Sequence, residues 1–335
     1  MLRTLLAAAL LLAPLPAQAA WKRIDLPKDV TLRAIATVGA GIVQVSGAKG
    51  TYAVSEDGGR TWRFAAPPEG AELDFRGLAA LDAKTTVLMS AGEGPKGQAK
   101  LFRTADGGRS WTQVFETSLP SSFLDTVAFR NGRVGYVLGD PIDGRWFLLR
   151  TQDGGRTWRR LPGPPVQPGE AAFAASNSAL FLGERSDVWI VSGGLSKGRV
   201  HHSADDGGTW TVAETPLAGS GSAGLFGGLS LGGGRAVVVG GDYKDELADM
   251  PSIALGDGSG WRLAPHAGTP RLLEGVGRLD ARTLLAVGPR GSSISEDDGR
   301  TWRQTDTEAF HAIACRAGTC VAAGGKGHVG IWVGE

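Results

Sequence analysis

Short runs with strand-like composition recur along this chain, and each is followed by polar turn residues. Runs such as Gly50–Val54, Leu101–Arg103 and Trp146–Arg150 lead directly into segments rich in Asp and Gly. No long apolar stripe repeats at helical spacing, and the 52 glycines suit tight turns better than helix interiors. The pattern predicts an all-β protein built from many short strands.

One eight-residue pattern, Ser/Thr-x-Asp-x-Gly-x-Thr/Ser-Trp, follows several of these runs. It reads SEDGGRTW from Ser55, TADGGRSW from Thr104, TQDGGRTW from Thr151, SADDGGTW from Ser203 and SEDDGRTW from Ser295. A weakened sixth version, ALGDGSGW, ends at Trp261 and keeps only part of the pattern. We expect each copy to form a hairpin in which the Asp carboxylate accepts backbone N–H groups and the glycines adopt positive φ.

We call each copy of this pattern a box. The predicted structural residues of a box are its Asp and its terminal Trp. They are Asp57 and Trp62, Asp106 and Trp111, Asp153 and Trp158, Asp205 and Trp210, and Asp297 and Trp302. Counting Trp261, successive box tryptophans lie 41 to 52 residues apart, a period typical of stacked repeats. We expect each Trp to pack between neighbouring repeats.

The two chain ends together look like one further repeat. The C-terminal GKGHVGIWV is similar to a segment that precedes a box, and the N-terminal AWKRIDLP is similar to a segment that follows one. The sequence therefore predicts a seven-bladed β-propeller closed by pairing of the N- and C-terminal strands, which removes exposed sheet edges.

The first residues have the composition of a secretory signal peptide. Arg3 precedes an apolar run to about Leu15 and the small-x-small site Ala17-Gln18-Ala19. We expect cleavage near Ala19, a leader at 1–19, a single propeller domain at 20–335, and a periplasmic or secreted protein. No later stretch predicts a transmembrane segment. Loss of Arg3 leaves 34 basic against 34 acidic residues, so we expect no nucleic-acid partner.

Cys315 and Cys320 are the two cysteines, and they flank the turn residues Arg316-Ala317-Gly318-Thr319 between two strand-like segments. Such neighbours in an exported chain favour a disulfide across a hairpin.

Five boxes at this spacing resemble the BNR/Asp-box repeat proteins, most closely the photosystem II stability/assembly factor-like family. The segments Gly139–Gly144, Glu170–Asn177 and Gly240–Tyr243 are also similar to those of bacterial members. The resemblance covers the whole mature chain. It implies an exported propeller that binds a membrane-associated protein partner during assembly of a membrane complex.

Loops on the face opposite the boxes are the expected binding surface, because propeller ligands bind near the axis. The candidate binding residues on that face are Asp140, Asp143, Arg145, Glu170, Asp242, Tyr243, Lys244 and Arg290. Asp125 and Arg76 lie in the same set of loops. Asp140, Glu170 and Asp242 stand beside glycines in nearby blades, and they are the catalytic candidates if the protein is an enzyme.

The enzymatic alternative is a glycoside hydrolase in which two of these carboxylates act as acid and base. A glycan is then the alternative partner. Sialidase activity is not expected, because the arginine cluster and tyrosine nucleophile of sialidases have no match here. No cofactor or metal motif is found, and His201 and His202, adjacent on a strand, are interpreted as solvated. We favour a non-catalytic binding protein.

Overall fold

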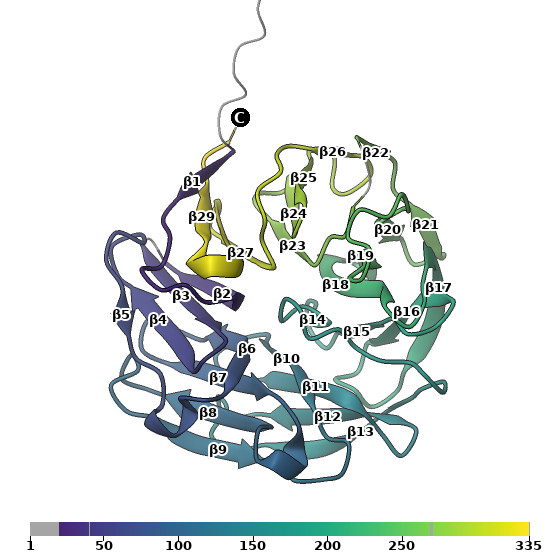
Figure 1. Ribbon diagram of the computed structural model, residues 1–335. Helices are drawn as coiled ribbons and strands as arrows, with labels where there is room; N and C mark the ends of the chain where they lie inside the picture. Colours follow the sequence, from purple (N-terminus) through teal and green to yellow (C-terminus); the bar gives the residue numbers. More distant parts are fainter. Residues whose placement is uncertain (1–19, 40, 269–270, 335) are drawn as a thin grey trace, which may run out of the picture.

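The computed structural model describes residues 20–39, 41–268 and 271–334; the predicted leader and its cleavage site at Ala19 lie outside this range. Seven sheets stand around a central axis, with the two ends of the chain side by side (Figure 1). The predicted seven-bladed β-propeller is therefore confirmed. None of the described helices is long and apolar enough to cross a membrane.

Each blade is an antiparallel sheet numbered here along the chain. Blade 1 contains β2 (Leu32–Val38), β3 (Ile42–Gly47), β4 (Thr51–Ser55) and β5 (Arg63–Phe64); blade 2 contains β6 (Asp74–Ala80), β7 (Thr86–Ala91), β8 (Lys100–Thr104) and β9 (Thr112–Glu116); blade 3 contains β10 (Leu124–Phe129), β11 (Gly135–Ile142), β12 (Arg145–Thr151) and β13 (Arg159–Pro165). Blade 4 contains β14 (Leu180–Leu182), β15 (Val188–Ser192), β16 (Lys197–Ser203) and β17 (Thr211–Ala218); blade 5 contains β18 (Ala223–Gly232), β19 (Arg235–Asp242), β20 (Ile253–Gly256) and β21 (Trp261–Leu263).

The last two blades differ from this plan. Blade 6 contains β23 (Gly275–Arg278), β24 (Leu284–Gly288), β25 (Gly291–Ser295) and β26 (Trp302–Gln304), and β22 (His266–Ala267) adds in parallel to β26. Blade 7 contains β27 (Ala312–Arg316), β28 (Thr319–Ala323), β29 (Val329–Trp332) and β1 (Trp21–Arg23). Three single-turn 3-10 helices, η1 (Pro68–Gly70), η2 (Gly94–Lys96) and η3 (Gly325–Gly327), lie in loops on the face opposite the boxes.

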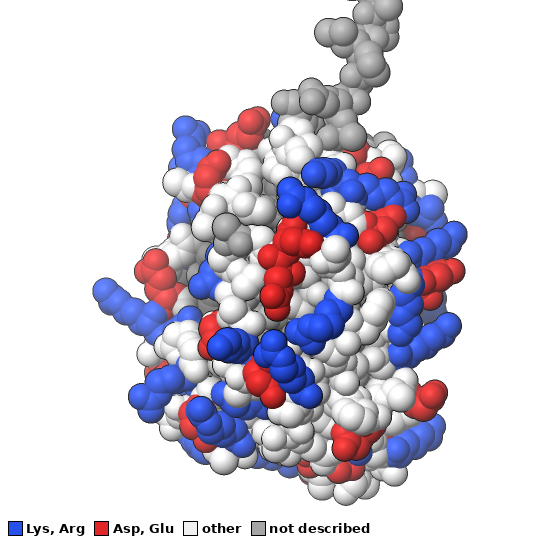
Figure 2. Space-filling model, turned by 90° about the vertical axis from the view of Figure 1, so that its left-hand side faces the viewer, with Lys and Arg blue, Asp and Glu red and all other residues white. Residues whose placement is uncertain are grey.

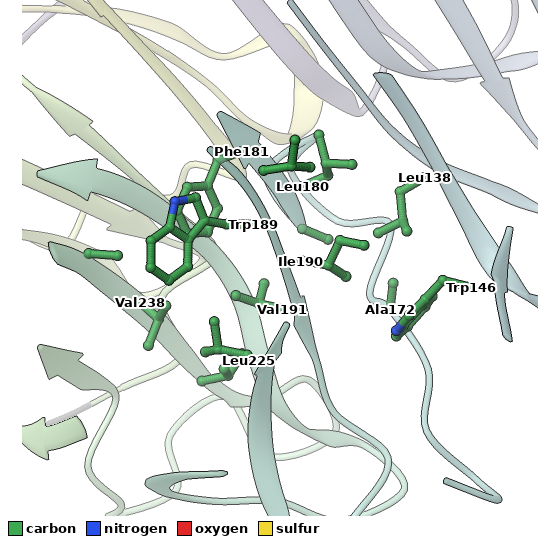
Figure 3. Close-up of a cluster of buried hydrophobic side chains, with 14 of the residues drawn as sticks. Leu138, Trp146, Ala172, Leu180, Phe181, Trp189, Ile190, Val191, Leu225 and Val238 are labelled. Carbon is green, nitrogen blue, oxygen red and sulfur yellow. The ribbon is translucent and has the colours of Figure 1, made fainter. Parts of the chain in front are cut away.

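The innermost strand of every blade packs against the innermost strands of both neighbours. This series runs from β2 through β6, β10, β14, β18 and β23 to β27, which packs back against β2. The packing between blades is apolar; Figure 3 shows the largest cluster, where Trp146 of blade 3, Trp189 and Ile190 of blade 4 and Leu225 of blade 5 are buried. Among the described residues the apolar core falls in six such clusters, each of which joins neighbouring blades around the ring.

Ring closure depends on the N-terminal strand β1. Trp21 lies opposite Trp332 and Arg23 opposite Gly330, so the first described strand completes the last blade. The Trp21 indole N–H lies 3.0 Å from Ser292 Oγ and 3.1 Å from Asp306 Oδ2, and its ring contacts Phe310 and Trp332. This arrangement confirms the predicted pairing of the chain ends.

The eight-residue segments form the hairpins between the third and fourth strands of their blades. In the first copy, Asp57 Oδ1 accepts the N–H groups of Arg60 and Thr61, and Thr61 Oγ1 donates to Oδ2 at 2.7 Å. Led by that Thr61 hydroxyl, these bonds lower the pKa of Asp57 to about 2. Trp111 of the second copy reaches back to blade 1, where its indole N–H donates to Ala65 O at 2.6 Å and its ring meets Tyr52 edge-on.

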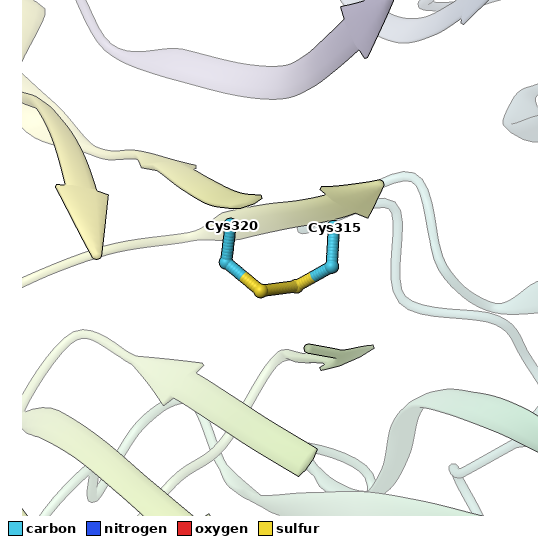
Figure 4. The surroundings of a disulfide bond; sticks show 2 residues. All are labelled: Cys315 and Cys320. Atoms are coloured by element: carbon cyan, nitrogen blue, oxygen red, sulfur yellow. A yellow bond between two sulfur atoms is a disulfide. The ribbon is translucent and has the colours of Figure 1, made fainter. Parts of the chain in front are cut away.

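Cys315 and Cys320 face each other on β27 and β28 and are joined by a disulfide (Figure 4). The bond links the two strands of the innermost hairpin of blade 7, the blade that the N-terminal strand completes.

Trp21→Ala should lower the free energy of unfolding by about 3–5 kcal/mol, because it empties the closure interface and leaves buried polar partners without a donor. Urea unfolding followed by tryptophan fluorescence and circular dichroism measures this cost. Val333→Ala, at an exposed position next to the same seam, is the matched control and should change stability by less than about 0.5 kcal/mol. Equal stability of the two variants would contradict the role of β1 in closure.

Candidate functional site

One cavity of about 410 Å³ lies on the axis, on the face opposite the box hairpins. We call it the axial pocket. Its lining includes at least one residue near the innermost strand of every blade: Arg33, Arg76, Asp125, Ala172 to Ala175, Phe226, Glu274 and His311 for blades 1 to 7 in turn. A hollow between β22 and β26 is also large, about 550 Å³, but it is lined by the blade 6 region alone. The axial pocket is therefore the site that depends on the whole ring.

A β-bulge in the innermost strand places several of these side chains. The pairing of β2 with β3 skips Arg33, that of β10 with β11 skips Asp125, and that of β18 with β19 skips Phe226. The pairing of β6 with β7 has one extra residue in the stretch that contains Arg76. Because a bulged residue leaves the alternation of the strand, its side chain can be redirected. Four blades thus use the same local device to direct a side chain into the axial pocket.

The segment 172–178, which we call the plug segment, crosses the axis below this pocket and projects toward the centre of the ring in Figure 1. Asn177 accepts a hydrogen bond from Val127 N–H of blade 3 at 2.9 Å and donates to Leu78 O of blade 2 at 3.1 Å. Ser176 donates to Glu274 O, beside blade 6, at 2.7 Å. The plug segment therefore joins blades on opposite sides of the ring and gives the pocket a floor.

The composition of the plug segment suits this path. Ala172, Ala174, Ala175 and Ser176 are small enough to pass close to other backbones, and Asn177 adopts φ +58°, a conformation that Asn tolerates better than most residues. Because the preceding residues form the plug, β14 is only three residues long.

Asp125, which is buried, and Asp140, which is half-buried, form a pair of carboxyl groups in the pocket. Burial, and then the charge of Asp140, raise the pKa of Asp125 well above its usual range. Burial also raises the pKa of Asp140 to about 6, against a lowering by the N–H of Ala172. Asp125 Oδ2 and Asp140 Oδ1 have no hydrogen-bond donor among the described residues. The fold thus raises the pKa of both carboxyl groups by burying them.

Aromatic side chains form another part of the wall. Phe173 of the plug segment stacks on Phe226 with ring centroids 4.4 Å apart, and Tyr243 meets Phe173 nearly edge-on at 5.6 Å. Tyr243 is 46% exposed, so this wall reaches from the pocket to solvent.

The remaining charged groups around the pocket have partners. Arg76 Nε donates to Asp74 at 2.7 Å and its Nη1 donates to Ala174 O at 3.3 Å. His311 Nδ1 lies 2.7 Å from Glu274 Oε2.

The guanidinium groups of Arg33 and Arg290 also lie in or beside the axial pocket. Burial lowers the pKa of Arg33, and the charge of Glu274 opposes that change. Arg290 Nε donates to Glu246 at 2.8 Å at the rim.

The three acids that the sequence singles out do not come together. Asp140 lines the axial pocket, but Glu170 lies inside blade 4 with its side chain fully buried, and Asp242 accepts the Lys244 N–H at the end of β19. Asp143 and Arg145 are exposed in the β11–β12 turn and do not line the pocket.

Glu170 is part of an internal ion-pair network. It contacts Arg199 closely, and it accepts Ser192 Oγ at 2.7 Å and lies 2.7 Å from His201 Nε2. Although burial alone raises its pKa, the hydrogen bonds from His201, Ser192 and the Gln167 N–H lower the pKa of Glu170 to about 2. This network supports blade 4 rather than a ligand site.

The histidine interpretation was wrong for His201, which is fully buried beside Glu170, with its Nε2 3.2 Å from the Trp146 indole nitrogen. His202 points to the other face, as strand alternation requires, and stacks on Trp189. Strand composition alone could not reveal the acid and the indole that come to His201 from a loop and from the neighbouring blade.

Sequence reasoning missed Arg33, Phe173, Phe226, Glu274 and His311, and it placed Asp125 and Arg76 in the loops without singling them out. The usable signal was position: several of these residues occupy the start of the innermost strand or the residue just before it, as Asp125, Glu274 and His311 do. Among the described residues, no three His, Cys, Asp or Glu side chains form a group that could hold a metal ion.

Comparison with known proteins supports the architecture. No protein-family model matches this chain, and no curated protein matches it either. Among solved structures, YCF48 bound to D1 peptide is similar, with a TM-score of 0.68, 17% identity, and coverage of 95% of this chain and 98% of that one. YCF48 from Cyanidioschyzon merolae has a TM-score of 0.69 at 13% identity, covering 94% and 99%. The likeness is one of fold.

An enzyme shares this fold too. The GH74 enzyme of Niastella koreensis matches with a TM-score of 0.65 and 15% identity over 92% of this chain, but this chain corresponds to only 53% of that one. The comparisons thus include one propeller solved with a bound peptide and one that is an enzyme.

Asp140→Asn should stabilise the protein at pH 7.5, by about 2 °C or more in melting temperature. The folded pKa of Asp140 is raised to about 6, so its ionisation costs stability as pH rises from about 4 to about 6. Melting curves between pH 4.5 and 8 should show the gain shrinking toward pH 4.5. Asp242→Asn is the control, since the pKa of Asp242 is lowered and the same change should give no gain. An Asp140→Asn variant that melts at or below wild type at pH 7.5 contradicts a raised pKa for this carboxyl group.

Glu170→Gln should instead destabilise the protein, by about 3–5 kcal/mol, because it removes one partner of a buried ion pair. Denaturant unfolding at pH 7.5 measures this loss. Glu214→Gln, which loosens the exposed pair with Lys197, should cost less than about 1 kcal/mol. A tolerated Glu170→Gln would show that the network around Glu170 is not structural.

Proposed function

We propose that this chain is an exported, non-catalytic binding propeller that holds an extended segment of a protein partner in the axial pocket. The observation that carries the proposal is a floored pocket lined by residues from all seven blades. Concave sites of this size, with apolar walls and a few polar groups, are typical of ligand binding. The bound D1 peptide of YCF48 supports a peptide as the class of ligand on this fold.

The rim of the pocket suits a protein segment that extends beyond it. Tyr243 is 46% exposed and Leu247, in the same β19–β20 loop, is 49% exposed. Exposed aromatic and aliphatic side chains beside a pocket supply the apolar contacts that anchor partners. The outer side of the ring in Figure 2 instead mixes both signs of charge and shows no single-sign field. The proposed binding surface is therefore the axial face, not the side wall.

Export and assembly of a membrane complex remain part of this proposal, and they rest on the leader-like first residues and on the family resemblance of the sequence. The described chain begins at Ala20, whose carbonyl accepts the Val333 N–H at 3.1 Å, so cleavage after Ala19 leaves the closure of the ring intact.

The enzymatic alternative finds a weaker basis in the pocket. Asp125 and Asp140 lie on the neighbouring strands β10 and β11 of one blade. The acid and base of a glycosidase instead flank the bond from two sides. The GH74 likeness is a reason to test hydrolysis directly, because the shared fold does not decide between binding and catalysis.

Photo-crosslinking from a photoreactive residue at position 243 tests the binding function. With the photoreactive residue at position 243, we expect one protein to crosslink through one continuous segment. With it at position 60, on the opposite face that carries the box hairpins, we expect no such crosslink. A synthetic copy of that segment should bind the purified protein, and Tyr243→Ala should weaken binding about 5- to 10-fold.

Equal crosslinking from both faces contradicts the axial site. Hydrolysis of xyloglucan by wild type that Asp125→Asn abolishes would favour the enzymatic alternative instead.

A further inference from the structure

The charges around the axial pocket do not balance. Four carboxyl groups line it, those of Asp125, Asp140, Glu246 and Glu274, against the two guanidinium groups of Arg33 and Arg76.

The cations nearby are already engaged. Arg76 donates a hydrogen bond to Asp74, and the charge of Glu274 acts on Arg33. At the rim, Arg290 forms an ion pair with Glu246. Glu274 also has His311 as a close partner. The charge of Arg76 also acts on Asp125 and opposes the rise of its pKa, but the Arg76 Nε bond goes to Asp74. The unmatched negative charge therefore lies at Asp125 and Asp140.

Each of the same two residues also has one carboxyl oxygen without a hydrogen-bond donor. Asp125 is 1% exposed, and its Oδ2 atom, like Oδ1 of Asp140, has no partner among the described residues. An unpaired buried acceptor costs about 1–3 kcal/mol, and more when it is charged. A hydrogen-bond donor that carries positive charge would supply both the missing hydrogen bond and the missing countercharge.

The shape of the pocket selects the form of that donor. The stacked rings of Phe173 and Phe226, with Tyr243 at their edge, line the pocket together with the two carboxyl groups. An aliphatic stem packs on such rings while its charged end passes on to the acids, and a cation near a ring face gains further attraction.

We infer that the axial pocket contains a subsite for a basic side chain, of lysine or arginine, with Asp125 and Asp140 receiving its charged end. The inference rests on the proposed function, because the side chain belongs to the bound protein segment. It adds to that function the chemical class of side chain that the pocket binds. The partner segment is expected to insert one basic residue past the aromatic wall.

Titration with small probes tests this subsite without a partner. The basic probes are N-acetyl-lysine amide and N-acetyl-arginine amide; N-acetyl-norleucine amide and N-acetyl-glutamate amide are the matched controls. Followed by NMR at pH 7.5, a basic probe should bind at least about tenfold more tightly than norleucine amide, the equivalent of one charge-assisted contact. Its binding should weaken by up to about tenfold from pH 7.5 to 5.0, because the probe then competes with a proton for the pair.

Asp140→Asn should reduce binding of the basic probe about tenfold and alter its pH dependence, while Asp242→Asn, outside the pocket, should leave both unchanged. Melting curves establish that each variant is folded. Failure of both basic probes to bind, tighter binding of glutamate amide, or an unaltered Asp140→Asn variant overturns the inference. Binding of Ca²⁺ in place of the basic probes, with the same dependence on Asp140, overturns it as well.

The two proposals fail separately. If the crosslinked segment still binds Asp140→Asn as it binds wild type, the basic subsite is wrong and the binding function stands. If the basic probes bind as expected but no protein crosslinks at position 243, the subsite stands and the proposed protein partner does not.

Discussion

The pairing of β1 with β29 is the constraint on which the rest of the structure depends. Three strands of blade 7 come from the end of the chain and one comes from its start, so the ring exists only when Trp21–Arg23 lie against Gly330–Trp332. The innermost strands β27 and β2 then pack together, and the axis becomes a closed channel. The axial pocket draws residues from all seven blades and would lose its wall if this seam opened.

Within the closed ring, two departures from regular repetition make the site. Bulges in innermost strands redirect Arg33, Asp125 and Phe226 toward the axis, and the plug segment converts a channel into a pocket with a floor. Neither feature strengthens the repeat itself. At both places the regular strand pairing is interrupted, and such departures from regular structure are common at functional sites.

The repeat could be predicted because its cause is local. The Asp57 carboxylate accepts bonds from residues three and four positions ahead, and the bond from four positions ahead recurs in the other four copies that keep the full pattern. The number of blades and the shared last blade follow from counting these segments and comparing the two ends.

The site could not be predicted in the same way, because its partners are distant. Glu170 and Asp140 are both acids in loop or strand-end positions. Glu170 meets Arg199 and His201 and becomes structural, whereas Asp140 meets Asp125 and keeps one oxygen without a donor. A bulge and a plug leave no periodic trace in the sequence. Asn177 shows the point, since its hydrogen bonds reach Val127 and Leu78, which lie 50 and 99 residues before it.

Amide hydrogen exchange of the protein with and without its crosslinked partner segment tests the central claim most directly. Binding in the axial pocket predicts new protection in the plug segment at 172–178, in the β19–β20 loop around Tyr243, and at the start of the innermost strands. The box hairpins should exchange as before. Protection confined to the box hairpins, with the plug segment unchanged, would contradict an axial site.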